Sequence, residues 1–387
     1  MNVGIYTVWA HSHPDFLGAV SGHVQIPLMT ADLLLQRGHQ VTLITTDAPP
    51  GYLIPPISAR GLWVHKVINA SRRFPESGIY PARALLQVAS LRRYLQVRKF
   101  DIVHFVGSRG TAYLLGLMKA TGLSTPAVMT LVTFASAASL HRRFLDRVLI
   151  SCIDRIATLT EFTRDELVRV GFQDVTVIRP GVFKRLDIGR NVPSCSETPA
   201  RNKVLFWRNA NARNGADICI QAFEYLSPRY KEIDFVFAVR PWDQLEAAVL
   251  DAAKRYENIH TYLYPYGEGI TLEGLLQSSI CAVLPLRRLS INPQMAILET
   301  MCAGCPVVTT NIESNKEIVD DRETGILIQP GSVEETISAI DFLLTTPRVA
   351  AEMGKLGSAR AMEKWNWWNY ECQLIDLYRR LLGDSAL

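Results

Sequence analysis

The sequence predicts an α/β protein with two Rossmann-like, doubly wound domains and an interdomain cleft. Short apolar runs typical of buried strands alternate with helical segments along most of the chain. This alternation breaks once, over residues 183–203, and then restarts. With 387 residues, the chain is also too long for one compact core. Because such sheets bind ligands at the carboxyl ends of their strands, we expect the active site in the cleft between the domains.

The N-terminal half opens with a strand–helix–strand pattern. Val3–Val8 is an apolar run, the following helix ends at Gly38, and a second strand is predicted at Val41–Thr45. Because parallel strands need a long crossover connection, this opening predicts a parallel sheet. The further predicted elements are strand Asp101–Phe105, helix Thr111–Ala120, strand Ala127–Leu131, strand Arg155–Leu159, helix Glu161–Val170 and strand Val175–Ile178.

The C-terminal half repeats the pattern after a polar, proline-containing stretch, residues 183–203, which we interpret as a linker. Apolar, β-branched runs again predict buried strands, separated by helices. The predicted elements are a strand from Val204, helix Ala216–Leu226, strand Phe235–Val239, helix Trp242–Tyr256, strand His260–Leu263, helix Leu272–Ser278, and strands Cys281–Leu284, Pro306–Thr310 and Gly325–Gln329.

The composition excludes several classes of protein. With 48% hydrophobic and 20% charged residues, the chain is a folded globular protein rather than a disordered one. Its formal net charge of +4 is small for this length and does not call for a nucleic-acid partner. The N-terminal segment MNVGIYTVWA has no basic leader, and no apolar run is long enough to cross a bilayer. These features predict a cytoplasmic protein.

The seven cysteines, an odd number in apolar segments, predict free thiols in a reducing compartment. Cys302 and Cys305 form a CxxC motif, but it lies at the end of a predicted helix. No helix N-terminus is available there to lower a thiol pKa. Since a lone CxxC is also weak evidence for a metal site, we expect neither a metal nor a required cofactor.

The segment Leu298–Gly331 combines a charge, two strands and three turns. Its helix ends at Gly304, which is followed by Pro306, as expected of a helix C-terminus. Glu299 is therefore a carboxylate on a helix whose other side chains are mostly apolar and expected to be buried. A buried carboxylate needs partners, so Glu299 is either paired or functional. A capping carboxylate near the positive end of the helix dipole is the simpler alternative.

This segment, LETMCAGCPVVTTNIESNKEIV with TGILIQPGS after it, resembles the donor-site segment of the retaining, nucleotide-sugar-dependent glycosyltransferases of family 4, which have the GT-B fold. The segments RGHQVTLITT, DIVH, DRIATLTEFTRDELVRVGF, VIRPGV and KWNWWNYECQLIDLYRRLL resemble other parts of the family in the same order. The resemblance implies an acceptor domain (1–182), a linker (183–203), a donor domain (204–364) and a terminal helix (365–387) that crosses back to the first domain.

The resemblance also implies a reaction. A sugar would move from a nucleoside-diphosphate sugar to a hydroxyl acceptor, which is a glycan, a lipid-linked molecule or a natural product, with retention of configuration and without a required metal. Two alternatives remain open on the sequence. One is a sugar-nucleotide epimerase of the same architecture, and the other is a catalytically inactive protein that binds nucleotide sugars. The sequence does not predict the oligomeric state.

In the family, the donor-site helix carries a Glu, seven residues, a second Glu, and then Gly-x-Pro-Val-Val. Glu299 matches the second Glu, which hydrogen-bonds the nucleotide ribose. Ile291 stands in place of the first Glu, and Val132 in place of a His that contacts the donor sugar. A site that loses such partners no longer favours the sugar hydroxyls they bind. These departures predict a deoxygenated or otherwise modified donor sugar.

The loop VLFWRNANARNGAD supplies cations for a leaving diphosphate, where negative charge grows as the glycosidic bond breaks. The family has Gly-Arg, four residues, then Lys-Gly. Arg208 fits the Arg, and Arg213 has the spacing of the Lys. Gly215 is one residue late, so an alignment from NGAD would place Asn214 there instead. Solvated arginine side chains on a loop are the structural alternative.

Two further groups are candidates for contacts with the donor. The turn before Glu299 faces the donor sugar and phosphate in the family. Tyr264 and Tyr266, after a predicted strand, could stack on a base, but core or rim aromatics are equally consistent with the sequence. The residues of the turn are Asn292, Pro293, Gln294 and Met295.

Near the N-terminus, Ser21 and Gly22 precede the first helix and match the family's glycine-bearing turn. Free N–H groups at a helix N-terminus bind anions. His11, His13 and His23 lie close by in the sequence. One of them could act on an acceptor hydroxyl, whereas a metal cluster lacks an acidic or cysteine partner.

The segment 72–99 is basic and amphipathic. Such a face can dock on anionic lipid or on a lipid-linked acceptor. A solvated helix face is the other interpretation. Its charged residues are Arg72, Arg73, Glu76, Arg83, Arg92, Arg93, Arg98 and Lys99.

Overall fold

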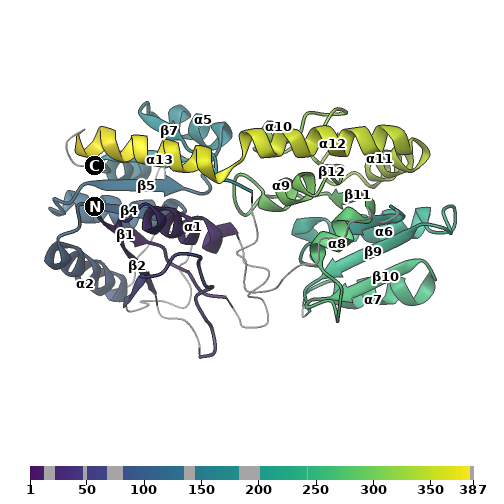
Figure 1. Ribbon diagram of the computed structural model, residues 1–387, viewed down its shortest axis with the longest axis horizontal. Helices are drawn as coiled ribbons and strands as arrows, with labels where there is room; N and C mark the ends of the chain where they lie inside the picture. Colours follow the sequence, from purple (N-terminus) through teal and green to yellow (C-terminus); the bar gives the residue numbers. More distant parts are fainter. Residues whose placement is uncertain are drawn as a thin grey trace. The chain divides into compact units, whose positions relative to one another are not determined.

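The computed structural model describes residues 1–12, 22–46, 50–67, 82–134, 144–182, 201–241 and 243–383. The chain forms two compact α/β units (Figure 1). Unit 1 comprises Met1–Ile188 and Trp367–Leu387, and unit 2 comprises Gly189–Asn366. Each unit contains one parallel, doubly wound sheet, which confirms the predicted fold class. The unit boundary falls inside the predicted linker 183–203.

Unit 1 is built on a seven-stranded parallel sheet of order β3-β2-β1-β4-β5-β6-β7. Its strands are β1 (Asn2–Tyr6), β2 (Gln40–Thr46), β3 (Trp63–Val67), β4 (Ile102–Gly107), β5 (Ala127–Leu131), β6 (Arg155–Thr158) and β7 (Val175–Val177). Its helices are α1 (Gly22–Gln36), α2 (Ala82–Arg98), α3 (Arg109–Ala120), the π-helix η2 (Asp146–Ile150), α5 (Glu161–Arg169) and α13 (Trp367–Leu382). Every strand except β3 corresponds to a predicted one.

The C-terminal helix α13, yellow in Figure 1, packs on unit 1 through one apolar face. Tyr370, Leu374 and Tyr378 are buried on this face, at the spacing of successive helical turns. The Tyr370 hydroxyl is 2.7 Å from Thr30 Oγ1, and the Tyr378 hydroxyl is 2.7 Å from His104 Nδ1. Two buried polar contacts therefore fix the position of this helix on the unit.

Unit 2 contains a six-stranded parallel sheet of order β10-β9-β8-β11-β12-β13. Its strands are β8 (Lys203–Phe206), β9 (Asp234–Val239), β10 (Ile259–Leu263), β11 (Ser279–Leu284), β12 (Val307–Thr310) and β13 (Gly325–Ile328). Its helices are the 3-10 helix η3 (Ala212–Asn214), α6 (Ala216–Leu226), α7 (Glu246–Arg255), α8 (Leu272–Gln277), α9 (Met295–Cys302), α10 (Asn315–Ile318), α11 (Val333–Thr345) and α12 (Pro347–Lys364).

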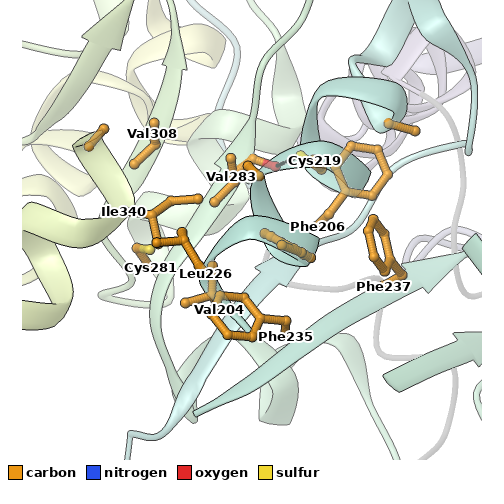
Figure 2. Close-up of a cluster of buried hydrophobic side chains, with 14 of the residues drawn as sticks. Val204, Phe206, Cys219, Leu226, Phe235, Phe237, Cys281, Val283, Val308 and Ile340 are labelled. Atoms are coloured by element: carbon orange, nitrogen blue, oxygen red, sulfur yellow. Dashed lines mark hydrogen bonds between the residues drawn. The ribbon is translucent and has the colours of Figure 1, made fainter. Parts of the chain in front are cut away.

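The core of unit 2 lies between the sheet and its helices. Figure 2 shows Phe206, Phe235 and Phe237 of the sheet packed with Leu226 of α6 and Ile340 of α11. Each of these side chains is fully buried. The apolar runs that identify the strands in the sequence thus become the contact surface between sheet and helices.

The direction of winding reverses between β8 and β11, which are neighbours in the sheet but not in the sequence. Ligands of doubly wound sheets bind outside the carboxyl ends of the strands at such a switch point. Three loops leave this edge of unit 2, and we name them for the strands they follow. The post-β8 loop is 207–215, the post-β11 loop is 285–294 and the post-β12 loop is 311–314.

Candidate functional site

A cluster of charged side chains surrounds Arg208, the second residue after β8. Burial lowers the pKa of the Arg208 guanidinium below its ordinary value; the carboxylate of Glu299 acts in the opposite direction. The charges of Arg240 and Arg213 also lower this pKa, and that of Asp243 raises it. Three cations and two carboxylates thus lie close enough to interact in one place. The Nε atom of Arg208 is buried and has no hydrogen-bond partner in the described part of the chain.

Side chains next to these residues hold the cluster in place. The indole Nε1 of Trp207 donates a hydrogen bond of 3.0 Å to Thr300 Oγ1, which brings their neighbours Arg208 and Glu299 together. Asp243 accepts from the Ala210 backbone N–H at 2.9 Å and from Asn209 Nδ2 at 3.2 Å. These hydrogen bonds connect the carboxyl ends of β8 and β9 to each other and to α9.

The post-β8 and post-β11 loops are bonded to each other. Arg213 Nη2 donates to the Leu289 carbonyl at 2.8 Å, and the Arg287 backbone N–H donates to the Arg213 carbonyl at 2.9 Å. Arg287 also pairs with both carboxylate oxygens of Asp217, at 2.6 and 2.7 Å. Asn214 is buried, and its Nδ2 donates to the Asn209 carbonyl at 3.0 Å, so this amide stabilises the loop.

Helices α6 and α9 begin at this edge of the sheet. Gly215, which precedes α6, has a φ of +77°, and neither Gly215 nor Gln294 caps its helix with a side chain. Since the first N–H groups of a helix have no partner within the helix, both ends can bind an anion. Together with the arginine cluster, they make this edge suited to a group such as a diphosphate.

The post-β12 loop brings in a further carboxylate. Glu313 accepts a hydrogen bond of 2.7 Å from Asn292 Nδ2, and the Oδ1 atom of the same amide accepts from Ser314 Oγ at 2.6 Å. Asn292 and Ser314 are fully buried. Ile291 has 2% of its surface exposed, and Gln294 and Met295 of the predicted turn have 2% and 4%. The peptide bond between Asn292 and Pro293 is cis.

Two family models match the chain on either side of the linker. The model described as glycosyl transferases group 1 matches residues 201–346, and the glycosyl transferase 4-like domain matches residues 21–181. These ranges cover most of the chain. The curated UDP-Gal:alpha-D-GlcNAc-diphosphoundecaprenol alpha-1,3-galactosyltransferase of Escherichia coli is 22% identical, covering 95% of this chain and 96% of that protein.

Solved structures of the same architecture span nearly the whole chain. Sucrose-phosphate synthase from Thermosynechococcus elongatus superposes with a TM-score of 0.74 at 16% identity, covering 99% of this chain and 100% of that one. Anabaena Alr3699/HepE in complex with UDP gives a TM-score of 0.70 at 14% identity, covering 98% and 100%. The chain is a GT-B glycosyltransferase of family 4 type.

Not every relative matches along its whole length. The MMP alpha-(1->4)-mannosyltransferase of Mycolicibacterium hassiacum is 26% identical over 123 residues, which is 30% of each chain. This chain and its relatives therefore belong to the same glycosyltransferase family. The donor and the acceptor of this chain have to be inferred from its own site.

The structure of this glycosyltransferase brings together most of the predicted donor residues in unit 2. Arg208, Arg213, Asn214 and Glu299 lie around the switch point, next to the predicted turn 292–295. Tyr264 and Tyr266 follow β10, which is the edge strand of the sheet, and their rings pack edge to face at 5.2 Å. Their role as a platform for a base stays a prediction.

The candidate residues of the glycosyltransferase's N-terminal half belong to unit 1. Gly22 and His23 open α1, buried His11 lies after β1, and Val132 is completely buried after β5. Ser21 and His13 lie outside the described residues, so the predicted turn and histidine group are described only in part. Residues 72–81 of the basic segment also lie outside the described residues. Its remainder forms α2, where Arg93, Arg98 and Lys99 are exposed near the end of the helix.

The CxxC cysteines of the glycosyltransferase are thiols, not thiolates. Burial raises the pKa of Cys302 to about 11 and that of Cys305 to about 12. This agrees with their position at a helix C-terminus. Among the described residues, no group of three His, Cys, Asp or Glu is arranged to hold a metal ion, and no helix there is long and apolar enough to cross a membrane.

Sequence reasoning misses three residues of this site: Arg240, Asp243 and Glu313. Arg240 and Asp243 follow β9, and they reach Arg208 because β8 and β9 are parallel neighbours. An arginine directly after a predicted parallel strand is a signal that could have identified Arg240. For Glu313, the signal is weaker, since its partner Asn292 is 21 residues away in the sequence.

Proposed function

We propose that this glycosyltransferase transfers a sugar from a nucleoside-diphosphate sugar to a hydroxyl acceptor with retention of configuration. The proposal rests on the cluster of charged side chains around Arg208. A guanidinium with a buried, unbonded Nε is adjacent to Glu299 and to two further arginines, at the switch point of a doubly wound sheet. This is the arrangement expected of a site that holds a diphosphate.

The cluster suits the charge that develops during transfer. When the bond between the sugar and the diphosphate breaks, the leaving diphosphate takes the electron pair. The acceptor oxygen forms the new bond to the sugar, and its hydroxyl proton passes to an oxygen of the leaving diphosphate. Arg208, Arg213 and Arg240 carry one more charge than Glu299 and Asp243 can neutralise. The remaining positive charge and the N-termini of α6 and α9 stabilise the leaving group.

Glu299 has a separate task in this proposal. It lies in the second turn of α9 and is half-buried beside Arg208. A carboxylate accepts hydrogen bonds from hydroxyl groups, so we assign Glu299 to the ribose of the nucleotide. The opposite charges of Glu299 and Arg208 attract each other. The UDP complex of the structural relative Alr3699/HepE supports a nucleotide as the ligand.

We propose that the reaction needs no divalent metal, because the arginines supply the positive charge that a metal would provide. Transfer should continue at an unchanged rate in excess EDTA. A loss of activity that Mg²⁺ or Mn²⁺ restores would contradict this part of the proposal.

For the acceptor we propose a lipid-linked molecule. The Escherichia coli relative is named for an acceptor attached to diphosphoundecaprenol. Arg93 and Arg98 of α2 and Lys99, the residue after this helix, are exposed basic residues. Clustered basic residues bind anionic lipid surfaces. The protein should therefore sediment with vesicles that contain phosphatidylglycerol and not with vesicles of phosphatidylcholine alone, and replacement of the three residues by Glu should abolish the difference.

Calorimetry with UDP, GDP, ADP and TDP tests the proposal as a whole. One of these nucleotides should bind, and the corresponding sugar nucleotides should then be tested for transfer and for slow hydrolysis. Absence of binding to all four would overturn the proposal. Binding without transfer or hydrolysis across a broad donor panel would favour an inactive nucleotide-sugar-binding protein. Conversion of the donor sugar with no acceptor present would favour an epimerase.

A further inference from the structure

The backbone of Glu313 has an unfavourable conformation. Its φ is +43°, in the left-handed region that residues with a side chain rarely adopt. Glycine would take this conformation without strain, and asparagine at a lower cost. Such outliers persist where the surrounding structure imposes them, and they concentrate at functional sites. The presence of glutamate here therefore suggests that its side chain has a use.

The Glu313 carboxylate is held on one side only. Oε2 accepts the hydrogen bond from Asn292 Nδ2, and the Asn292 amide is itself fixed by Ser314. No other hydrogen bond or ion pair of Glu313 is present among the described residues. Since an ionised carboxylate accepts several hydrogen bonds, Oε1 retains its capacity to accept from a ligand.

The position of this carboxylate relates it to the proposed diphosphate site. β8, β11 and β12 are successive parallel strands of the sheet, in this order. The loops that follow them therefore lie at one edge of the sheet. Arg213 bonds to Leu289, three residues before Asn292, and Asn292 lies three residues before the start of α9 at Met295. Arg213 of the arginine cluster and Glu313 of the post-β12 loop thus contact the same post-β11 loop, at Leu289 and at Asn292.

We propose that Glu313 is a specificity-determining residue that accepts a hydrogen bond from a hydroxyl group of the donor sugar, with Asn292 as the residue that positions it. This inference rests on the proposed function. It assigns the polar contact with the sugar to the post-β12 loop and not to position 291, where the isoleucine is almost completely buried.

The test uses Glu313→Gly and, as a matched control, Arg322→Gly. Arg322 is an exposed residue of unit 2 with a φ of +64°, so both variants relieve the same kind of backbone strain. The probes are UDP and GDP, with UDP-glucose, UDP-galactose and GDP-mannose as donors. In Glu313→Gly, the affinity for the nucleoside diphosphate should stay within about twofold, and kcat/KM for the sugar donor should fall by about tenfold or more. Arg322→Gly should change neither.

A structural role would give a different result. Loss of a residue that only stabilises the loop would lower the melting temperature and weaken UDP or GDP binding along with donor use. We expect instead a melting temperature of Glu313→Gly close to that of the wild type, because the removal of backbone strain offsets the loss of the hydrogen bond from Asn292. Glu313→Gln, which keeps the shape, should lose part of the donor preference.

The outcomes also separate this inference from the proposed function. If the wild-type protein binds and uses a sugar nucleotide but Glu313→Gly has the same kcat/KM, only the inference is overturned. An equal loss of nucleotide and sugar-nucleotide affinity would likewise overturn it. If the wild type binds no nucleotide, the proposed function itself fails.

Discussion

A Cβ atom at Gly215 would lie 2.2 Å from the carbonyl oxygen of Pro285, a distance that real contacts do not reach. This close approach joins the post-β8 loop to the post-β11 loop at the start of α6. Gly215 also has a φ of +77°. Two independent physical requirements, conformation and space, thus select glycine at the point where both loops enter the arginine site.

Gly215→Ala should therefore disturb the site severely. The left-handed backbone costs about 1–2 kcal/mol for a residue with a side chain, and the collision with Pro285 adds about 1–3 kcal/mol or displaces the loop. Gly269→Ala is the matched control, because Gly269 has a φ of +76° with nothing within 4 Å of its Cβ position. Urea unfolding and nucleotide calorimetry should show a larger stability loss, and a loss of affinity, for Gly215→Ala only. Equal effects of the two variants would argue against the contact.

Arg208→Ala should weaken nucleoside-diphosphate binding by about tenfold to a hundredfold. Hydrogen bonds to charged groups contribute about 1.5–3 kcal/mol, which corresponds to this range. Arg348→Ala, at an exposed position of α12, should leave the affinity unchanged. The measurement is calorimetric titration of the best nucleotide of the panel. Unchanged affinity in Arg208→Ala would remove this residue from the site.

The strands of both sheets were predictable from the sequence where they are fully buried, because continuous apolar runs identify them. The structure places β5 at the predicted residues, Ala127–Leu131, and every residue of it is buried. β3 could not be predicted in this way. It is an edge strand of sequence WVHKV, in which Trp63 is 73% exposed and only Val67 is buried. Its strand conformation follows from pairing with β2, a tertiary contact that leaves no pattern in the sequence.

The residues of the site that belong to local sequence motifs could be predicted from the sequence. Arg208 and Glu299 stand out because each occurs in a recognisable strand–loop–helix context. Arg240 acts only through its proximity to Arg208, which the order of strands determines. Glu313 requires knowledge of a backbone angle and of the distant partner Asn292. Neither quantity can be read from spacing along the chain.

In unit 1, His104 connects the sheet to the C-terminal helix. Its Nδ1 is 2.7 Å from the Tyr378 hydroxyl of α13, and its Nε2 is 2.7 Å from Thr130 Oγ1. Complete burial lowers the pKa of His104 from 6.5 to about 3. The imidazole is therefore neutral in the folded protein at pH 7.

This pKa makes the stability of unit 1 sensitive to acid. Below pH 6.5, the unfolded chain binds a proton at His104 that the folded chain does not bind until the pH approaches 3. The free energy of unfolding is therefore not reduced by His104 above about pH 6.5, and it decreases as the pH falls from 6.5 toward 3. From pH 7 to pH 5, the wild type should lose about 2 kcal/mol more than His104→Gln, measured by urea unfolding. Parallel pH profiles of the two proteins would contradict this assignment.

Ile291→Glu distinguishes two interpretations of the sugar pocket. The sequence alone suggests that apolar side chains at positions 291 and 132 face a deoxygenated sugar, in which case Ile291→Glu should shift preference toward fully hydroxylated donors. The structure leaves only 2% of Ile291 exposed and places the Glu313 carboxylate on its neighbour Asn292. We therefore expect a buried carboxylate that costs several kcal/mol of stability and confers no new donor preference.

Ile291→Val is the control for packing, and it should cost about 0.5–1.5 kcal/mol. Urea unfolding and kcat/KM for a hexose donor and its deoxy analogue should be measured for the wild type and both variants. On our interpretation, the wild type already prefers the hydroxylated donor, because Glu313 accepts the hydrogen bond of the sugar hydroxyl. An Ile291→Glu protein as stable as the wild type, with a new preference for the hydroxylated donor, would instead show that position 291 contacts the sugar.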